Sequence, residues 1–213
     1  MRLLWKKIPN RTCIRKSAKE APRHKTWKDR LTLVHTTGHM IKPGIVYRVK
    51  NPLALKNKNY LPVFWYHNQK AWVIAILFME WYHQCFIPEV KKYLEEEALE
   101  FKVLLIIDKA PGHPESICSE NENFKVVFLL LYITSWLQPL DQGIIQFVKV
   151  TYTCLVFDYI WWAIDADPNL NKKHCWKSFT IADTITFLKA AMDKLELETV
   201  SACWKNLWSH EWF

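Results

Sequence analysis

A short apolar run that ends in an aspartate constrains the fold more than any other part of the sequence. Residues 101–107 read Phe-Lys-Val-Leu-Leu-Ile-Ile and are followed directly by Asp108. A continuous apolar run of this length, rich in β-branched side chains, is typical of a strand buried on both faces of a sheet. Residues 109–114 contain two prolines and a glycine, which favour a loop. We therefore expect Asp108 to lie at the carboxyl end of a buried strand.

A second aspartate, Asp141, stands where another long apolar stretch begins. Residues 124–130 repeat the pattern of a buried strand, and residues 138–143 then lead into a helical pattern of apolar side chains that continues to Trp161. Pro139 suits the first turn of a helix, and the helix dipole favours a negative charge at the same end. The sequence therefore predicts that Asp141 lies near a helix N-terminus.

Two carboxylates in these positions have two interpretations. Mg²⁺ and Mn²⁺ prefer oxygen ligands, and two such ions about 4 Å apart can activate a water or a 3′ hydroxyl in phosphodiester cleavage. Alternatively, Asp108 caps a loop and Asp141 caps a helix, each accepting hydrogen bonds from backbone N–H groups. Taken without their surroundings, the two residues favour the capping interpretation.

The rest of the chain predicts an α/β protein with one sizeable core, since half of its residues are apolar. Residues 70–98 are expected to form a helix that Pro88 kinks or splits, with its aromatic side chains in the core. Residues 165–173 are expected to form a loop that divides the chain into regions 1–165 and 166–213. The other predicted elements are two early strands and two C-terminal helices, at residues 30–34, 44–49, 180–195 and 198–208.

Positive charge is concentrated near the beginning of the chain. Residues 1–60 carry 16 lysines and arginines against two acids, whereas residues 61–213 carry 13 against 19. A basic segment attracts polyanions such as nucleic acid, with an affinity that falls steeply as salt rises. A solvated basic surface is the alternative. The basic residues expected to contact DNA are Lys6, Lys7, Arg11, Arg15, Lys16, Arg23, Lys25 and Arg30.

Two classes of protein do not fit the sequence. The longest near-apolar run, residues 126–137, is shorter than the roughly 20 residues that cross a bilayer. Lys6 and Lys7 stand where a secretory signal needs apolar residues, so we expect an intracellular protein without a membrane partner. The six cysteines are scattered without a C-x-x-C pair, which predicts reduced thiols and no zinc.

Longer motifs around both aspartates resemble one family. Leu104-Leu-Ile-Ile-Asp-Lys-Ala-Pro-Gly-His-Pro114 is similar to a strand motif in which the second metal-binding aspartate precedes an Asn-Ala-Pro-Gly-His loop. Thr134-Ser-Trp-Leu-Gln-Pro-Leu-Asp-Gln-Gly-Ile144 is similar to the motif that carries the third. With Lys70-Ala-Trp72 and residues 80–89, these segments resemble the DDE superfamily endonuclease domain of Tigger transposable element-derived proteins, relatives of jerky and centromere protein B.

This resemblance carries several expectations. It implies an RNase H-like mixed sheet flanked by helices in residues 1–165, followed by a small C-terminal helical extension in residues 166–213. It implies that Asp108 and Asp141 are the second and third acids of a catalytic triad that binds Mg²⁺ or Mn²⁺. It also implies a DNA substrate and a nuclear location.

The sequence departs from the family pattern near each acid. The first acid of the family lies in an Asp-Glu-Thr-Gly segment directly before the stretch that is residues 3–7 here, and the chain begins at Met1 without it. Lys109 replaces the asparagine after the second acid, where we expect it to pair with Asp108 and to compete with a metal ion. Residues 130–133 are apolar where the family has a turn.

We therefore expect a catalytically inactive, transposase-derived protein that contacts DNA without sequence preference. Two alternatives stay open. One is a working Mg²⁺-dependent DDE endonuclease or transposase that takes its third carboxylate from Glu115 or from a second chain. The other is a decayed fragment with no stable fold or selected role. Self-association also stays open.

Overall fold

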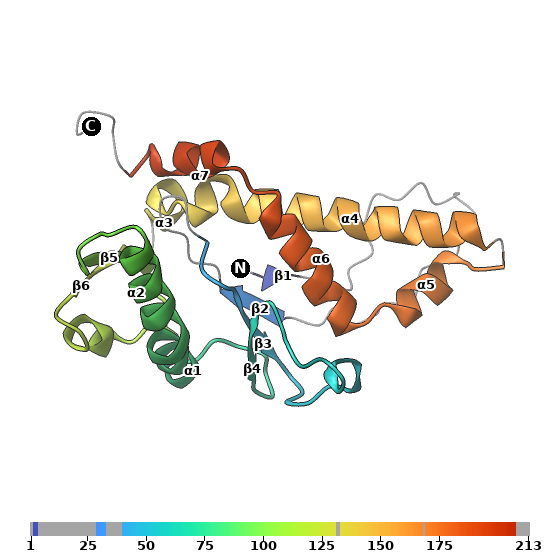
Figure 1. The fold of residues 1–213 in the computed structure, drawn as a ribbon, viewed down its shortest axis with the longest axis horizontal. Coiled ribbons are helices and arrows are strands. Elements are labelled where there is room, and N and C mark those ends of the chain that lie inside the picture. The colour runs from blue at the N-terminus through green and yellow to red at the C-terminus, as the bar shows by residue number, and fades with distance from the viewer. Residues whose placement is uncertain (1, 4–28, 33–39, 131–132, 168, 208–213) are drawn as a thin grey trace.

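A computed structural model of the chain describes residues 2–3, 29–32, 40–130, 133–167 and 169–207 (Figure 1). In these residues, helices surround two small sheets, so the predicted α/β class is confirmed. The larger sheet consists of β1 (Arg2–Leu3), β2 (Asp29–Thr32), β3 (Gly44–Tyr47) and β4 (Phe64–His67), in that order. The first three strands are antiparallel, and β4 runs parallel to β3. The sheet is therefore mixed, and β2 and β3 confirm the two early strands expected from the sequence.

Side chains that alternate along β4 divide the interior into two cores. Trp65 packs with α4 (Ile145–Ala166) and α6 (Ile181–Asp193) in one core. Phe64 and Tyr66 pack with the helix that begins at Ala75 in the other. Because successive side chains of a strand point to opposite faces, helices cover both faces of this sheet, as Figure 1 shows.

The helix expected at residues 70–98 runs from Ala75 to Glu96 as α1 (Ala75–Trp81), a π-helical turn (Tyr82–Phe86) and α2 (Ile87–Glu96). The wider π turn comes directly before Pro88. A proline has no N–H to donate and its ring crowds the carbonyl four residues earlier, so a local π turn lets the helix continue. Pro88 was predicted to kink or split the helix, and the structure instead shows a change of helix type before Pro88 and no break.

The same helix begins later than expected. The Asn68 side chain accepts hydrogen bonds from the backbone N–H groups of Lys70 and Trp72, which fixes a loop in place of a first turn. Phe78 and Trp81 are buried, as expected for core aromatics. Trp72 is 44% exposed, so its assignment to the core was wrong.

The strand that ends at Asp108 is β5 (Val103–Asp108), and it pairs in parallel with β6 (Phe124–Leu129). Both predicted strands are confirmed. Leu105 and Ile107 are buried against α1 and α2, whereas Leu104 on the opposite face is 44% exposed. The expectation that this strand is buried on both faces is therefore wrong, because in the described structure helices cover only one face of the pair.

The C-terminal half consists of helices. After α3 (Thr134–Leu137), a π-helical turn (Leu140–Ile144) leads into α4. The next helices are α5 (Lys172–Ser178), α6 and α7 (Leu197–Trp204). The predicted helices at 138–161, 180–195 and 198–208 are confirmed, and α5 was not predicted. The division of the chain at residue 165 stays a prediction.

The long helix α4 is apolar over most of its length. With the preceding turn, Leu140–Ala166 spans 27 residues and is apolar enough to cross a membrane by length and composition. This criterion alone is weak, since core helices of soluble proteins also meet it. Tyr152, Val156 and Ile160 pack in the same core as residues of α6, while Trp161 and Trp162 on another side are exposed. One face of α4 therefore packs in the core of the described structure, and another side is exposed.

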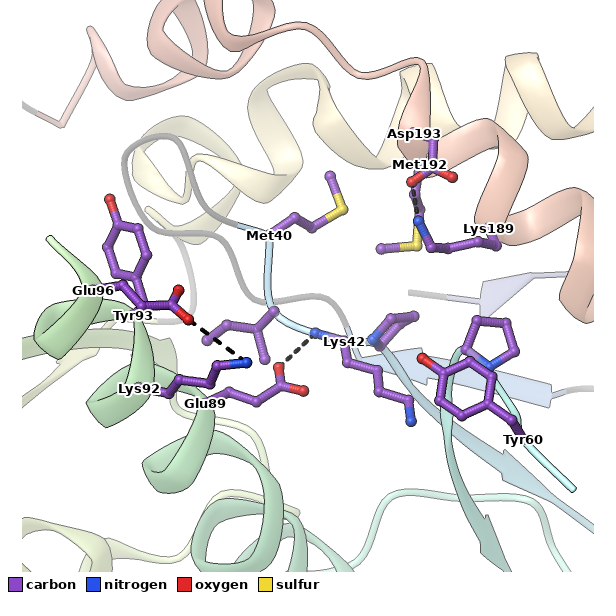
Figure 2. A pocket seen from close by; sticks show the side chains of 13 residues that line it. Met40, Lys42, Tyr60, Glu89, Lys92, Tyr93, Glu96, Lys189, Met192 and Asp193 are labelled. Carbon is purple, nitrogen blue, oxygen red and sulfur yellow. Dashed lines mark hydrogen bonds and ion pairs between the residues drawn. The ribbon is translucent and has the colours of Figure 1, made fainter.

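A cavity of about 360 Å³ lies between α2, α6 and the chain segments that enter β3 and β4 (Figure 2). Its residues are distinct from those around Asp108, which are described next.

Candidate functional site

Asp108 is the last residue of β5, opposite Leu129 of β6. Its carboxylate is about one third exposed. The loop predicted after this strand is observed at residues 109–114, and it returns toward the strand end. The paired strands thus hold Asp108 at the carboxyl end of β5, as the sequence predicts.

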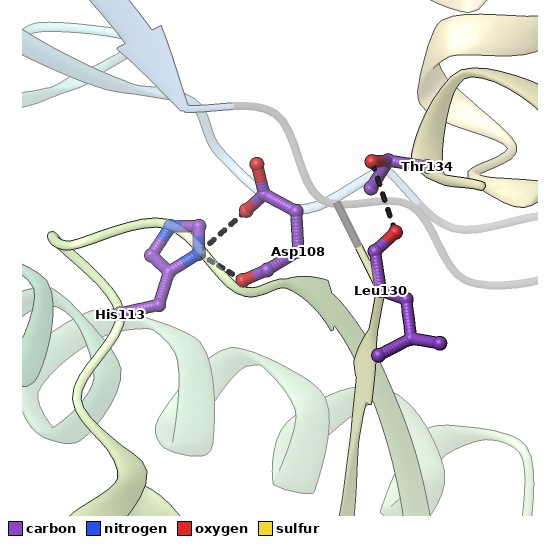
Figure 3. Close-up of polar contacts among 4 residues, drawn as sticks. All are labelled: Asp108, His113, Leu130 and Thr134. Atoms are coloured by element: carbon purple, nitrogen blue, oxygen red, sulfur yellow. Dashed lines mark hydrogen bonds and ion pairs between the residues drawn. The ribbon is translucent and has the colours of Figure 1, made fainter. Parts of the chain in front are cut away.

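His113 is the direct partner of Asp108 (Figure 3). Its Nδ1 atom lies 2.7 Å from Asp108 Oδ1 and 2.9 Å from the backbone oxygen of Asp108. Both neighbours are acceptors, so Nδ1 carries the proton and donates to them. The imidazole also packs on Phe78, with ring centroids 4.5 Å apart. His113 therefore fixes the orientation of the carboxylate and leaves Oδ2 facing outward.

Gly112 lets the loop approach Val73, in the segment that leads into α1. A Cβ atom at this position would lie 2.8 Å from the backbone oxygen of Val73, closer than real contacts of this kind. Only glycine fits without a shift of one backbone segment against the other. The glycine that marked a loop in the sequence therefore also positions the neighbouring His113.

The charges of Asp108 and His113 reinforce each other. The hydrogen bond from His113 lowers the pKa of Asp108 and outweighs the opposing effect of burial. Burial lowers the pKa of His113, but the hydrogen bonds and the negative charge of Asp108 outweigh it, so that this pKa is raised. Folding thus favours the ionised forms of both groups.

Lys109 does not pair with Asp108, contrary to the sequence prediction. Its ammonium lies 2.8 Å from Glu115 Oε1, and both side chains are exposed. The reason is geometric, because His113 already occupies the inner side of Asp108 while Glu115 begins the short 3-10 helix Glu115–Ser119. The structure thus also places Glu115, the candidate substitute ligand, in an ion pair with Lys109.

Asp141 lies in the π-helical turn that leads into α4, as expected for a helix N-terminus. The residue is exposed, but its pKa is raised, mainly because neighbouring atoms partly desolvate the carboxylate. The negative charge of Asp108 raises this pKa further. The two carboxylates therefore lie within electrostatic range of each other.

The turn that carries Asp141 contacts α7 and the residues that follow α7. Asn206 Nδ2 donates to Gln142 Oε1 over 2.7 Å, and a Cβ atom on Gly143 would lie 3.2 Å from Cys203 Sγ. Ile144 is buried in a small core with Val200 and Cys203. On the other side, Thr134 Oγ1 donates to the Leu130 carbonyl at the end of β6 (Figure 3). Sequence reasoning missed both this support and the role of His113, although His113 stood within the recognised motif.

Asp108 and Asp141 offer the carboxylate oxygens that a hard cation prefers as ligands. Mg²⁺ is commonly bound through one or two carboxylates and keeps several waters, and Asp108 and Asp141 supply two carboxylates. Asp108 and Asp141 would be the residues that hold such an ion. Asp108 would bind it through Oδ2, the oxygen that is not bonded to His113. In the parts of the chain that the structure describes, no three His, Cys, Asp or Glu side chains group together as a metal site.

Most of the basic residues expected to contact DNA cannot be placed. Arg30 lies in β2, where its backbone is opposite Arg2 of β1 and Val46 of β3. The other residues of that prediction lie outside the described residues: Lys6, Lys7, Arg11, Arg15, Lys16, Arg23 and Lys25.

Asp108 lies at the end of a strand, and Asp141 lies in the first turn of a helix, within electrostatic range of Asp108. These positions are the ones that the sequence motifs implied. The DDE superfamily endonuclease family matches residues 27–204, and the chain belongs to this family.

Individual relatives agree with this assignment. The chain is 27% identical to the jerky protein homolog of Homo sapiens over 97% of its own length and 35% of that protein. It is 32% identical to the jerky protein of Mus musculus over 67% of its length and 26% of that protein. It is 30% identical to Tigger transposable element-derived protein 7 of Homo sapiens over 70% of its length and 29% of that protein. The chain thus spans about a third or less of these relatives. No solved structure shows a significant match.

Proposed function

We propose that this chain is a transposase-derived nuclear protein that contacts DNA without sequence preference and does not cut it. The observation that carries the proposal is the placement of Asp108 and Asp141, within electrostatic range of each other, inside the region that the endonuclease family matches. On this proposal the chain keeps an RNase H-like scaffold and the remnant of a metal site.

Charge supports the contact with DNA. The 16 lysines and arginines of residues 1–60, against two acids, form a basic segment that overlaps the beginning of the family domain, which matches residues 27–204. Such a segment binds phosphates of any sequence and releases condensed counterions. One relative is named as transposable element-derived, which supports descent from an ancestor that acted on DNA.

The donor set supports the loss of cutting. Asp108 has one oxygen engaged by His113, and Asp141 is exposed on a turn. Two carboxylates of this kind suit one Mg²⁺ or Mn²⁺ ion, whereas cleavage by two ions needs a second ion held about 4 Å away. We therefore propose that a divalent ion binds weakly here and that strand cleavage does not follow.

Binding to random duplex DNA at increasing salt tests the first half of the proposal. We expect the logarithm of the association constant to fall linearly with the logarithm of the salt concentration, because each phosphate contact releases a counterion. Fluorescence anisotropy with two unrelated duplexes should give equal affinities. Tight binding that several hundred millimolar salt does not weaken would contradict the proposal.

A plasmid-nicking assay with Mg²⁺ or Mn²⁺ tests the second half. We expect no nicking by the wild-type chain. Nicking that both Asp108→Ala and Asp141→Ala abolish would instead establish a working endonuclease with a third ligand from elsewhere. Nicking that neither substitution affects would point to a contaminant.

A further inference from the structure

The cavity between α2 and α6 is a separate site with its own chemistry (Figure 2). Its volume of about 360 Å³ falls in the range of pockets that hold small molecules. It shares no residue with the Asp108 and His113 site. An inference about this cavity therefore does not depend on the proposed function.

The carboxylates that line the cavity already have partners. Glu89 accepts a hydrogen bond of 2.8 Å from the backbone N–H of Lys42. On α2, Glu96 lies 3.6 Å from the ammonium of Lys92, and on α6, Asp193 pairs with Lys189. These pairs satisfy the acids locally, so the cavity gives little attraction to a cation.

Lys42 differs from the other two lysines. Its ammonium lies 4.9 Å from the ring centroid of Tyr60 and 4.8 Å from that of Phe64. Among the described residues, its contacts are these rings and no carboxylate. The aromatic faces hold the ammonium in place without neutralising it. A partly buried cation of this kind is stabilised most by an anion that brings hydrogen-bond acceptors.

The remaining walls of the cavity are apolar. Met40 comes from the segment that enters β3 and Met192 comes from α6, as Figure 2 shows, and Pro43 and Pro62 also line the cavity. Flexible thioethers adapt to ligands of different shapes. The walls therefore suit the uncharged body of a ligand rather than a hydrated ion.

We propose that this cavity binds a small organic acid whose carboxylate or phosphate group pairs with Lys42 and whose apolar body packs between Met40 and Met192. Of the three lysines that line the cavity, Lys42 is the one for which the described residues give no carboxylate partner, and the anionic group would take that place. The apolar body displaces water from the methionine and proline walls.

Three probes that share a phenyl group test this proposal on the whole chain. Phenyl phosphate and phenylpropionate carry the two candidate anions, and phenylpropanol is the neutral counterpart. Calorimetry and saturation-transfer NMR should show that at least one acid binds and that the alcohol binds roughly tenfold more weakly or not at all. The better acid identifies the anionic group. Equal binding of the alcohol, or no binding of either acid at millimolar concentration, would overturn the proposal.

Variants of Lys42 locate the binding. Lys42→Met keeps the apolar stem but removes the charge, and it should weaken the better acid roughly tenfold or more. Lys42→Arg keeps the charge and should retain most of the affinity. Lys58→Met removes the charge of an exposed lysine elsewhere and should leave binding unchanged. If Lys42→Met binds the acid as well as the wild type, the site is wrong. The comparison of acid with alcohol on the wild type stands even if a variant folds poorly.

Discussion

Asp108 and Asp141 are held by different kinds of structure. Asp108 ends a paired strand, its carboxylate accepts a hydrogen bond from His113, and its pKa is lowered. Asp141 is exposed on a π-helical turn, its pKa is raised, and the contact that braces the turn comes from Asn206, 64 residues beyond Gln142. The hydrogen-bond partner of the first aspartate thus lies five residues along the chain, whereas the turn of the second is braced by a residue from a distant segment.

The largest effect should come from filling the space beside the strand end. Gly112→Ala would place a Cβ atom 2.8 Å from the Val73 oxygen and force apart two backbone segments. We expect a loss of about 1–3 kcal/mol in the free energy of unfolding, since overpacking has a cost of this size. Urea denaturation followed by tryptophan fluorescence measures it.

Gly143→Ala is the matched control at the helix start. Its Cβ atom would lie 3.2 Å from Cys203 Sγ, and a side-chain sulfur can give way more easily than a backbone oxygen. The loss of stability should therefore be smaller than for Gly112→Ala. The reverse order would show that the turn near Asp141, and not the strand end, is the more tightly packed region.

The next effect concerns the pair itself. Asp108→Asn and His113→Phe each remove the charged hydrogen bond, and phenylalanine keeps a ring beside Phe78. A double-mutant cycle by urea denaturation should give a coupling energy of about 1 kcal/mol, since partial exposure to solvent reduces the free energy that a charged hydrogen bond contributes. Additive effects of the two substitutions would mean that the pair does not stabilise the fold.

The same coupling should depend on pH. Because folding lowers the pKa of Asp108, its contribution is present above the ordinary aspartate pKa and is lost as pH falls through the folded value. Because folding raises the pKa of His113, its contribution is complete below the ordinary histidine pKa and is lost as pH rises through the folded value. The coupling should be largest between about pH 4 and 6.5. The measurements should be made with a chelator present, so that no divalent ion binds. A coupling energy that increased toward pH 9, above this window, would contradict the prediction.

The contrast between the two aspartates also explains what the sequence could and could not predict. Strand β5, its terminal Asp108 and the loop after it follow from local patterns, namely β-branched residues and then proline and glycine. The helix start at Asp141 follows from Pro139 and the apolar period. By contrast, the choice of His113 over Lys109 as the partner of Asp108 depends on the close approach of Gly112 to Val73. Contacts between distant segments of this kind produce no periodic pattern and no motif spacing that could be recognised in the sequence.

Asp141→Asn should change stability much less than Asp108→Asn. The raised pKa of Asp141 means that folding disfavours its ionised form, so a neutral side chain should be tolerated or slightly stabilising near neutral pH. We expect a change within about 0.5 kcal/mol, because the residue is exposed and the shift is screened by water. Denaturation at neutral pH measures this. A large loss of stability would mean that the ionised carboxylate stabilises the start of α4 by more than its desolvation costs.

The smallest effect is expected next to Asp108. Lys109→Gln removes an exposed ion pair with Glu115 and leaves the hydrogen bond between His113 and Asp108 in place. Exposed pairs contribute little, so the melting temperature and the coupling between residues 108 and 113 should not change measurably. If Lys109 instead acted on Asp108, its removal would raise the pKa of this carboxylate and alter the acid side of the pH profile. An unchanged profile would establish that the identity of residue 109 matters little to the strand end, because the loop has already given Asp108 its partner.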